Sequence, residues 1–277
     1  MSHSSEDRLE RFASGGAACM TAFKLLRIVL QLLEGLLTCA LVFPFVGEAV
    51  RARLIRRWSI KLLRLCQVEV VVIDKAAGTS PAHALIVANH ISWLDIFVIN
   101  VWHPCRFVAK ADIRAWPLLG WLCDKAGTIF IERGSLRAVR RIYEGLVHRL
   151  HAGERVAFFP EGTTSTQGTL LPFHSNLFES AVEAGVAVQP FAVRYLCVEP
   201  DIGRFGKTGR FHPSVTFIGD MTFVESLMAI LKGGKIRAEL VRLPPIATVG
   251  GHRRELAQAA HAAIAAELAA AGERRAA

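Results

Sequence analysis

The chain has 277 residues, 52% of them hydrophobic, and a formal net charge of +9 at pH 7. This length allows one large domain or two small ones, and a mean hydropathy of +0.34 is high for a purely water-soluble protein. The positive charge indicates an anionic partner such as lipid headgroups, nucleic acid or acidic proteins, while six cysteines without a Cys-x-x-Cys pair argue against zinc and redox motifs and for a reducing compartment.

Residues 18–66 form a helical segment that we expect to associate with a membrane, after a polar tail over 1–17 that we expect to be disordered. Residues 28–46 are almost continuously apolar, and at about 1.5 Å per residue they just span a hydrocarbon core of roughly 30 Å. Gln31 and Glu34 interrupt this run, and a carboxylate in mid-bilayer costs about 2.5–3.5 kcal/mol. The sequence therefore leaves open whether the segment spans the membrane or only embeds in it.

Residues 51–66 combine a basic face with an apolar stripe. The basic side chains are Arg51, Arg53, Arg56, Arg57, Lys61 and Arg64, and the stripe at helical spacing is Leu54, Trp58, Leu62 and Leu65. This profile is typical of a helix that lies in the membrane interface near anionic lipid. The alternative is an ordinary amphipathic helix that packs on the core with a solvated basic face. The apolar neighbour at 28–46 favours the membrane interpretation.

From residue 68 the pattern alternates between strands and helices. Strands are predicted over 68–73, 84–87, 106–109, 128–132, 156–159, 188–195, 214–218 and 235–243, and helices over 92–101, 117–126, 136–152, 177–184, 224–230 and 252–271. This alternation predicts an α/β fold with a sheet covered by helices on both faces. No linker divides residues 67–277, which we therefore take as one domain.

The stretch VANHISWLD at residues 87–95 contains the most suggestive pair of side chains. His90 follows a predicted strand, where reactive groups of α/β proteins gather, and Asp95 comes five residues later. A carboxylate in the first helical turn is able to orient an imidazole in the loop before it, as in acyl-transfer triads. Ser92 and Asp95 equally fit a capping box at a helix start. The spacing alone leaves both interpretations open.

Three further motifs follow in order: GTIFIER at 127–133, FFPEGTTS at 158–165 and VQPFA at 188–192. With NHISWLD at 89–95, these four blocks resemble the glycerolipid acyltransferases, typified by 1-acylglycerol-3-phosphate acyltransferase. The resemblance covers about residues 85–192. It implies an α/β domain with a central mixed sheet flanked by helices, and N-terminal helices that attach it to the membrane.

The resemblance also implies roles for individual residues. His90 would be the general base for an acceptor hydroxyl, and Asp95 would orient it. The implied acceptor-binding residues are Arg133, Glu161, Gly162, Thr163 and Lys110, of which Arg133 and Lys110 would contact phosphate. The implied reaction moves a fatty acyl chain from acyl-CoA or acyl carrier protein to 1-acyl-sn-glycerol-3-phosphate, giving phosphatidic acid. Neither a metal nor another cofactor is implied. The expected location is the inner membrane, with the catalytic domain in the cytoplasm.

Two positions depart from the family pattern. Many members have arginine where Thr164 stands, and a Lys-x-Gly pattern near residues 173–177, where this chain reads FHSNL. Both family positions are usually linked to the anionic headgroup. Relatives that act on lyso-ornithine lipid, which lacks the glycerol phosphate, have a sequence like PFHSNLF there, as do some glycerophosphate enzymes. Lyso-ornithine lipid, or another lysolipid, is therefore the alternative acceptor.

Other function classes explain less of the sequence. A serine hydrolase needs a G-x-S-x-G elbow and a zinc protease an H-E-x-x-H motif, and neither occurs. Nucleic acid is not an expected partner, because the basic residues alternate with leucines rather than exposed aromatics. A non-catalytic peripheral protein that binds anionic lipid through residues 51–64 accounts for the charge. It does not account for His90, Asp95 and Glu161 together.

Overall fold

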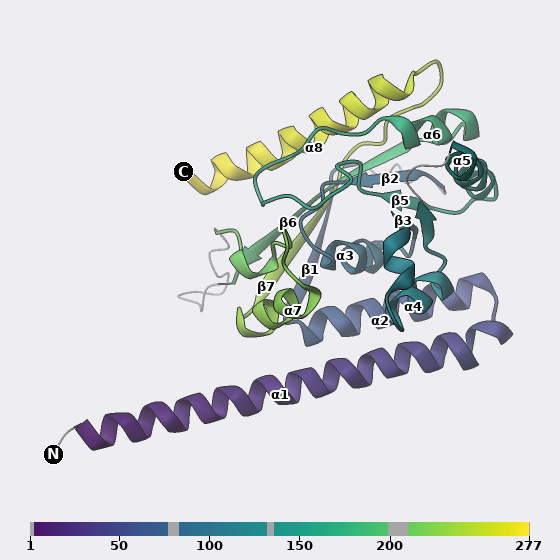
Figure 1. The fold of residues 1–277 in the computed structure, drawn as a ribbon. Helices are drawn as coiled ribbons and strands as arrows, with labels where there is room; N and C mark the ends of the chain where they lie inside the picture. Colours follow the sequence, from purple (N-terminus) through teal and green to yellow (C-terminus); the bar gives the residue numbers. More distant parts are fainter. Residues whose placement is uncertain (1–2, 77–82, 132–135, 199–209, 277) are drawn as a thin grey trace.

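The computed structural model describes residues 3–76, 83–131, 136–198 and 210–276 of the chain, and Figure 1 shows its fold. Seven strands form one sheet in the order β1-β7-β6-β2-β5-β3-β4. Their bounds are β1 (Val68–Asp74), β2 (Leu85–Ala88), β3 (Arg106–Lys110), β4 (Ile129–Ile131), β5 (Val156–Phe158), β6 (Val188–Cys197) and β7 (Ile236–Arg242). Neighbouring strands are parallel except β6 and β7. The predicted mixed sheet is therefore confirmed.

Helices cover both faces of this sheet, as the alternation of the sequence predicts (Figure 1). One face carries α2 (Glu48–Leu65), α3 (Leu94–Trp102) and α7 (Phe223–Lys232), and the other carries α5 (Leu136–His151), α6 (Glu179–Ala184) and α8 (Arg253–Ala276). Successive side chains of a strand point to opposite faces. In β2, Ile86 and Ala88 join the first cluster, and Leu85 and Val87 the second. A strand buried on both faces reads as a continuous apolar run, which is the pattern that predicted it.

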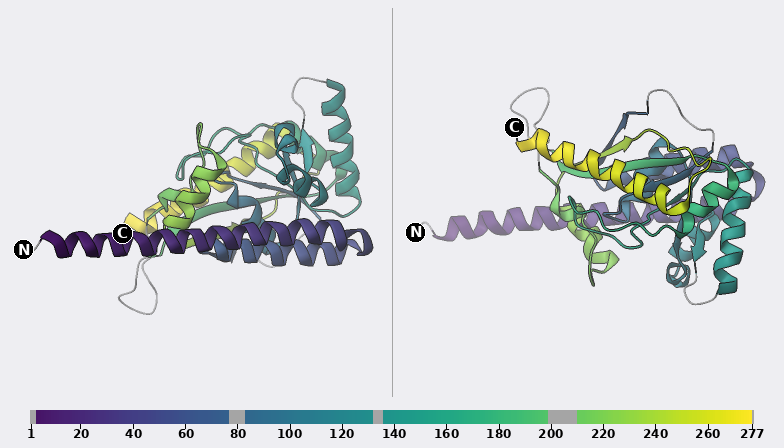
Figure 2. Two further views of the ribbon diagram at one scale, coloured as in Figure 1. Left: turned by 60° about the horizontal axis from the view of Figure 1, so that its bottom comes forward. Right: turned by 90° about the horizontal axis from the view of Figure 1, so that it is seen from above.

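Helix α1 (His3–Leu41) lies beside α2 along the edge of the molecule, and its N-terminal part projects beyond the domain (Figure 2). A 3-10 helix, η1 (Phe43–Phe45), connects the two. The expectation of a disordered tail over 1–17 is not met, because α1 begins at His3. The tail contains no proline, the residue that most strongly interrupts a helix.

Helix α2 is amphipathic as predicted, and its apolar stripe packs inside the protein. Leu62 and Leu63 are buried in the cluster shared with α3 and α7. The Trp58 indole packs against Phe97 and donates a hydrogen bond to the Gln31 carbonyl of α1 at 2.9 Å. The core-packing interpretation is thus correct for the apolar stripe. The basic residues of α2 lie apart from this buried stripe and line a hollow on the surface.

The strand predicted over 214–218 is wrong. Residues Pro213–Val215 form a 3-10 helix, η4, and the chain beyond it is irregular. Its main chain bonds to two loops instead of to a neighbouring strand. The Phe217 N–H donates to the Ile91 carbonyl in the His90 loop at 3.0 Å, and the Phe217 carbonyl accepts from the Thr164 hydroxyl in the loop after β5. A hydrophobic pattern does not distinguish these two uses of an extended backbone.

Candidate active site

Parallel strands bring the first and third motif blocks to one edge of the sheet. β2 pairs with β5 in parallel register, so the loop after Ala88 and the loop after Phe158 leave the sheet side by side. The first loop carries His90 and the second carries Glu161. Ligands of open α/β sheets bind at this carboxyl edge of the strands, where we find the candidate active site.

His90 and Asp95 form a hydrogen-bonded pair at this edge. The His90 Nδ1 lies 2.8 Å from the Asp95 Oδ2, and the imidazole is 19% exposed whereas the carboxylate is fully buried. An ionised carboxylate only accepts, so Nδ1 carries the proton and Nε2 has the free lone pair. The described residues donate no hydrogen bond to Nε2. This tautomer suits a general base on a part-exposed ring.

The buried Asp95 carboxylate is held by four donors. Its Oδ2 accepts from the His90 ring and from the backbone N–H groups of Ile91 at 2.8 Å and Ser92 at 2.9 Å. Its Oδ1 accepts from the Tyr195 hydroxyl at 2.6 Å. The capping interaction with the Ser92 N–H is therefore present together with the contact to His90. Asp95 thus accepts a hydrogen bond from the helix start and also contacts the imidazole, so the two contacts do not exclude each other.

The backbone of His90 is clamped from two sides. Its N–H donates to the Glu161 Oε1 at 2.7 Å, and its carbonyl accepts from the Ser165 N–H at 2.8 Å. The preceding residue, Asn89, bonds both the N–H and the carbonyl of Val193 in β6. The imidazole stacks on the Phe159 ring, with centroids 3.9 Å apart and planes 7° from parallel. These contacts fix the position of the ring as well as its tautomer.

Glu161 occupies a different place from the acceptor-lining one that we expected. Its side chain is 4% exposed, and its two oxygens accept from the backbone of His90 and, at 2.9 Å, of Leu171. Burial raises the pKa of this carboxyl above its usual range, against the opposing effect of the two backbone hydrogen bonds. Since both oxygens serve the protein itself, Glu161 braces the His90 loop.

The remaining predicted residues are dispersed around this edge. Gly162 has a φ of +69° in the loop beside Glu161, and a Cβ there would approach the His174 ring within 3.3 Å. Thr163 is exposed in the same loop, and Lys110 is exposed at the carboxyl end of β3. The described residues form no hydrogen bond or ion pair with the Lys110 ammonium group. Arg133 lies outside the residues that the structure describes.

Sequence reasoning missed Tyr195. All five residues of the VQPFA block are buried in β6, where they support the sheet. Tyr195 lies three residues beyond the block in the same strand and is fully buried. A buried tyrosine needs a hydrogen-bond partner for its hydroxyl. The signal that could have found it is a hydroxyl group within a long, mostly apolar strand.

Comparisons with known proteins agree with this geometry. The acyltransferase family model matches residues 69–194. The lyso-ornithine lipid O-acyltransferase of Pseudomonas aeruginosa is 39% identical over 216 residues, 78% of each chain. The 1-acyl-sn-glycerol-3-phosphate acyltransferase of Neisseria gonorrhoeae is 43% identical over 123 residues, 44% of this chain and 48% of the relative.

A solved structure shares the fold. The crystal structure of the 1-acyl-sn-glycerophosphate acyltransferase from Thermotoga maritima aligns with a TM-score of 0.62 at 22% sequence identity, covering 91% of this chain and 94% of that one. The fold alone does not specify chemistry. The identity to the Pseudomonas protein over 78% of both chains does establish kinship. The chain belongs to the glycerolipid acyltransferase family.

Proposed function

We propose that the chain is a lysolipid O-acyltransferase in which His90 is the general base. The acceptor hydroxyl gives its proton to the His90 Nε2 while its oxygen attacks the carbonyl carbon of an acyl thioester. An ester C–O bond forms, the C–S bond breaks, and the proton passes from His90 to the departing thiolate. The observation that supports this proposal is the 2.8 Å contact of a part-exposed imidazole with a buried carboxylate. The donor is acyl-CoA or acyl carrier protein.

Two acceptors are candidates, 1-acyl-sn-glycerol-3-phosphate and lyso-ornithine lipid. The first is favoured by relatives 43% identical over a 123-residue segment, and the second by a relative 39% identical over 78% of the chain. Position 164 favours the second. The Thr164 hydroxyl donates to the Phe217 carbonyl, so it has neither the charge nor the freedom of the arginine that is common there. We place lyso-ornithine lipid first and the glycerol phosphate acceptor second.

The residues after the FFPEGTTS block also favour lyso-ornithine lipid as the acceptor. The His174 N–H donates to the Pro160 carbonyl at 2.9 Å, and the His174 ring lies against Gly162. Position 174 thus belongs to the acceptor side of the site, where the chain has an exposed histidine and not the lysine of the Lys-x-Gly pattern. Fewer fixed positive charges here suit an acceptor without a phosphate monoester. Arg133 and Lys110 stay the proposed contacts for an anionic headgroup.

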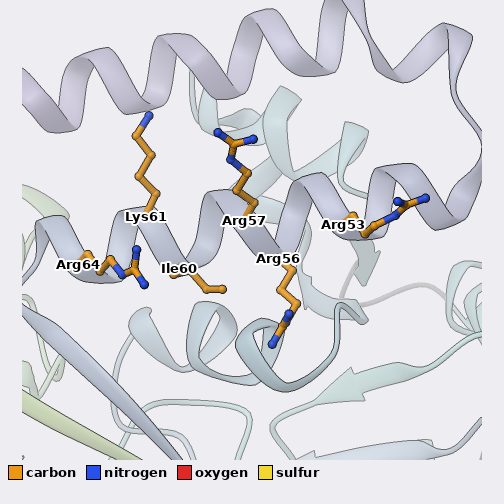
Figure 3. A pocket seen from close by; sticks show the side chains of 6 residues that line it. All are labelled: Arg53, Arg56, Arg57, Ile60, Lys61 and Arg64. Carbon is orange, nitrogen blue, oxygen red and sulfur yellow. The ribbon is translucent and has the colours of Figure 1, made fainter.

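Membrane attachment is proposed to use α1 and α2 together. The outer face of α1 presents a continuous exposed apolar stripe, Met20, Phe23, Leu26, Leu30, Leu33, Leu37 and Leu41. Beside it, a hollow of about 450 Å³ on α2 is lined by Arg53, Arg56, Arg57, Ile60, Lys61 and Arg64. Arg57 and Lys61 point toward α1, and Arg56 points the opposite way (Figure 3). An apolar stripe beside a cationic face suits an anionic bilayer surface.

The packing of α1 favours embedding over spanning. By length and composition the segment Met20–Phe45 is able to cross a membrane. Its inner face, however, contacts the catalytic domain: Ile28, Gln31 and Cys39 are buried, and the Lys24 ammonium donates to the Leu231 carbonyl of α7 at 3.0 Å. A spanning helix would lose these contacts. We infer that α1 lies half-embedded in the cytoplasmic leaflet, with the active-site edge at the membrane surface.

The test is acyl transfer by the purified full chain in anionic phospholipid vesicles. Four reactions combine lyso-ornithine lipid or 1-acyl-sn-glycerol-3-phosphate with acyl-CoA or acyl carrier protein, and the product lipid is quantified by mass spectrometry. We expect product with at least one donor, and a higher kcat/KM for lyso-ornithine lipid. A reversed preference would make phosphatidic acid the product. No transfer in any combination, with vesicle binding retained, would favour the non-catalytic lipid-binding alternative.

A further inference from the structure

Tyr195 is connected to the reacting histidine through one intermediate group. Its hydroxyl donates to the Asp95 Oδ1 at 2.6 Å, while the other oxygen of the same carboxylate faces the His90 Nδ1 at 2.8 Å. A carboxylate with only one fixed oxygen is free to turn about its Cβ–Cγ bond. With donors on both oxygens, Asp95 has a single orientation.

The tyrosine is itself held rigidly. Its side chain is fully buried in the cluster that contains Leu94, Val215 and Leu227. Its backbone N–H donates to the Gln167 Oε1 at 2.8 Å, and its carbonyl accepts from the His212 N–H at 3.0 Å. Two residues earlier in β6, Val193 bonds the Asn89 amide. Strand β6 therefore fixes both Asn89, at the start of the His90 loop, and the Asp95 carboxylate.

We propose that Tyr195 is a positioning residue for the acyl transfer, which acts by donating to Asp95 and so sets both the orientation and the basicity of His90. This inference rests on the proposed function of His90. A strong donor on Oδ1 withdraws charge from the carboxylate, and this weakens its hold on the imidazolium. The hydroxyl thus limits how strongly Asp95 holds the protonated ring.

Few other ionisable groups face the pair among the described residues. Glu161, from the loop after β5, bonds the His90 backbone, and His174 lies farther out beside Gly162. The helices packed over this face, α2 and α7, contribute leucine and isoleucine to the surrounding cluster. Burial and the Asp95 charge together raise the pKa of Tyr195 well above its usual value. The hydroxyl therefore stays protonated, and a donor, throughout the working pH range.

The test compares Tyr195→Phe with Tyr143→Phe, since the sequence has only these two tyrosines. The Tyr143 hydroxyl also donates to a carboxylate, Glu183 Oε2 at 2.5 Å, but between α5 and α6. We expect Tyr195→Phe to lower kcat by about 10- to 100-fold, the value of a hydrogen bond to a charged group. KM for both substrates should be unchanged, and the acid limb of kcat/KM against pH should move to higher pH. Tyr143→Phe should match the wild type.

A double-mutant cycle separates this effect from packing. If Tyr195 acts through Asp95, then Tyr195→Phe should change kcat less than about twofold in an Asp95→Asn background. An unmoved acid limb, additive losses in the cycle, or unfolding of Tyr195→Phe would each overturn the proposal, because each assigns the hydroxyl to stability alone. Wild-type transfer activity is measured in the same assay. Its absence would instead contradict the proposed function.

Discussion

The candidate site has one residue that we propose to meet the substrate, His90, and several residues that hold it in place. The His90 ring is part-exposed, whereas Asp95, Glu161 and Tyr195 are buried and contact the ring, the His90 backbone or the Asp95 carboxylate. A buried charge is stable only when its hydrogen bonds are complete. Asp95 accepts hydrogen bonds from four donors and Glu161 from two backbone N–H groups, and these bonds offset the cost of burying a carboxylate.

Glu161→Gln tests the bracing role at the residue scale. A glutamine side chain offers one oxygen and one NH₂ group, so either His90 or Leu171 loses the acceptor of its N–H. We expect the free energy of unfolding to fall by about 1–3 kcal/mol, and kcat to fall with it. Urea denaturation and initial rates measure both. Glu69→Gln, at an exposed position of β1, is the neutral control. Wild-type stability and rate in Glu161→Gln would refute the brace.

The sequence predicted that His90 and Asp95 lie together, but not that Glu161 and Tyr195 hold them in place. Spacing and motif placed His90 beside Asp95, because a loop after a strand and the first turn of the next helix are necessarily close. Glu161 and Tyr195 come 71 and 100 residues from their partners. Their contacts depend on strand order, which periodicity does not encode. This is why the sequence assigned Glu161 to the substrate and overlooked Tyr195.

At the scale of elements, α2 has two chemically distinct faces. Its apolar stripe packs against α3 and the sheet, while its basic face stays exposed. Composition predicted the amphipathic helix. It could not decide between membrane and core, because both need the same 3.6-residue period. The structure shows that the apolar stripe of α2 serves the core, and that the exposed apolar surface belongs to α1.

Arg57→Glu should weaken binding to vesicles that contain anionic lipid. A basic residue near such a surface contributes about 1 kcal/mol, so a charge reversal should lower the partition coefficient by about 10- to 30-fold at low salt. Vesicle co-sedimentation measures this. Arg254→Glu on α8, also exposed but across the sheet, should have a much smaller effect. High salt should reduce the difference. If Arg57→Glu and Arg254→Glu lowered the partition coefficient equally, α2 would not be part of the membrane-binding surface.

For the molecule as a whole, a buried ionic network connects the sheet to the last helix. The Arg194 guanidinium in β6 pairs with Glu239 of β7 and, at 3.1 Å, with Glu267 of α8, and Glu267 also pairs with Lys75 after β1. Burial alone would raise the pKa of Glu267, but the hydrogen bonds from Lys75 and Arg194 outweigh it and lower the pKa. The ionised form therefore stabilises the native state.

Glu267→Gln should make this contribution visible through pH. An acid with a lowered native pKa stabilises the fold above its unfolded pKa of about 4.3 and loses this effect as pH falls through the native value. We expect Glu267→Gln to be less stable than the wild type by about 1.5–3 kcal/mol at pH 7. The difference should shrink below about pH 4. A difference that is the same at both pH values, by urea denaturation, would contradict the network.

The architecture itself was largely predictable, because a sheet buried on both faces leaves continuous apolar runs between amphipathic helices. The exceptions are informative. Residues 214–218 have a strand pattern but bond to the His90 loop, and α1 extends into a segment whose composition suggested disorder. In both places tertiary or helical hydrogen bonding decides the conformation. Hydrophobic periodicity carries no information about it.

The central claim is that a neutral His90, oriented by Asp95, removes the proton from a lipid hydroxyl. The most direct measurement is kcat for acyl transfer by His90→Ala in anionic vesicles, with vesicle binding and thermal unfolding measured on the same sample. We predict a fall of about 10²–10⁴-fold, the usual contribution of a general base, with binding and stability unchanged. A folded, vesicle-bound His90→Ala protein that turns over at the wild-type rate would contradict the account.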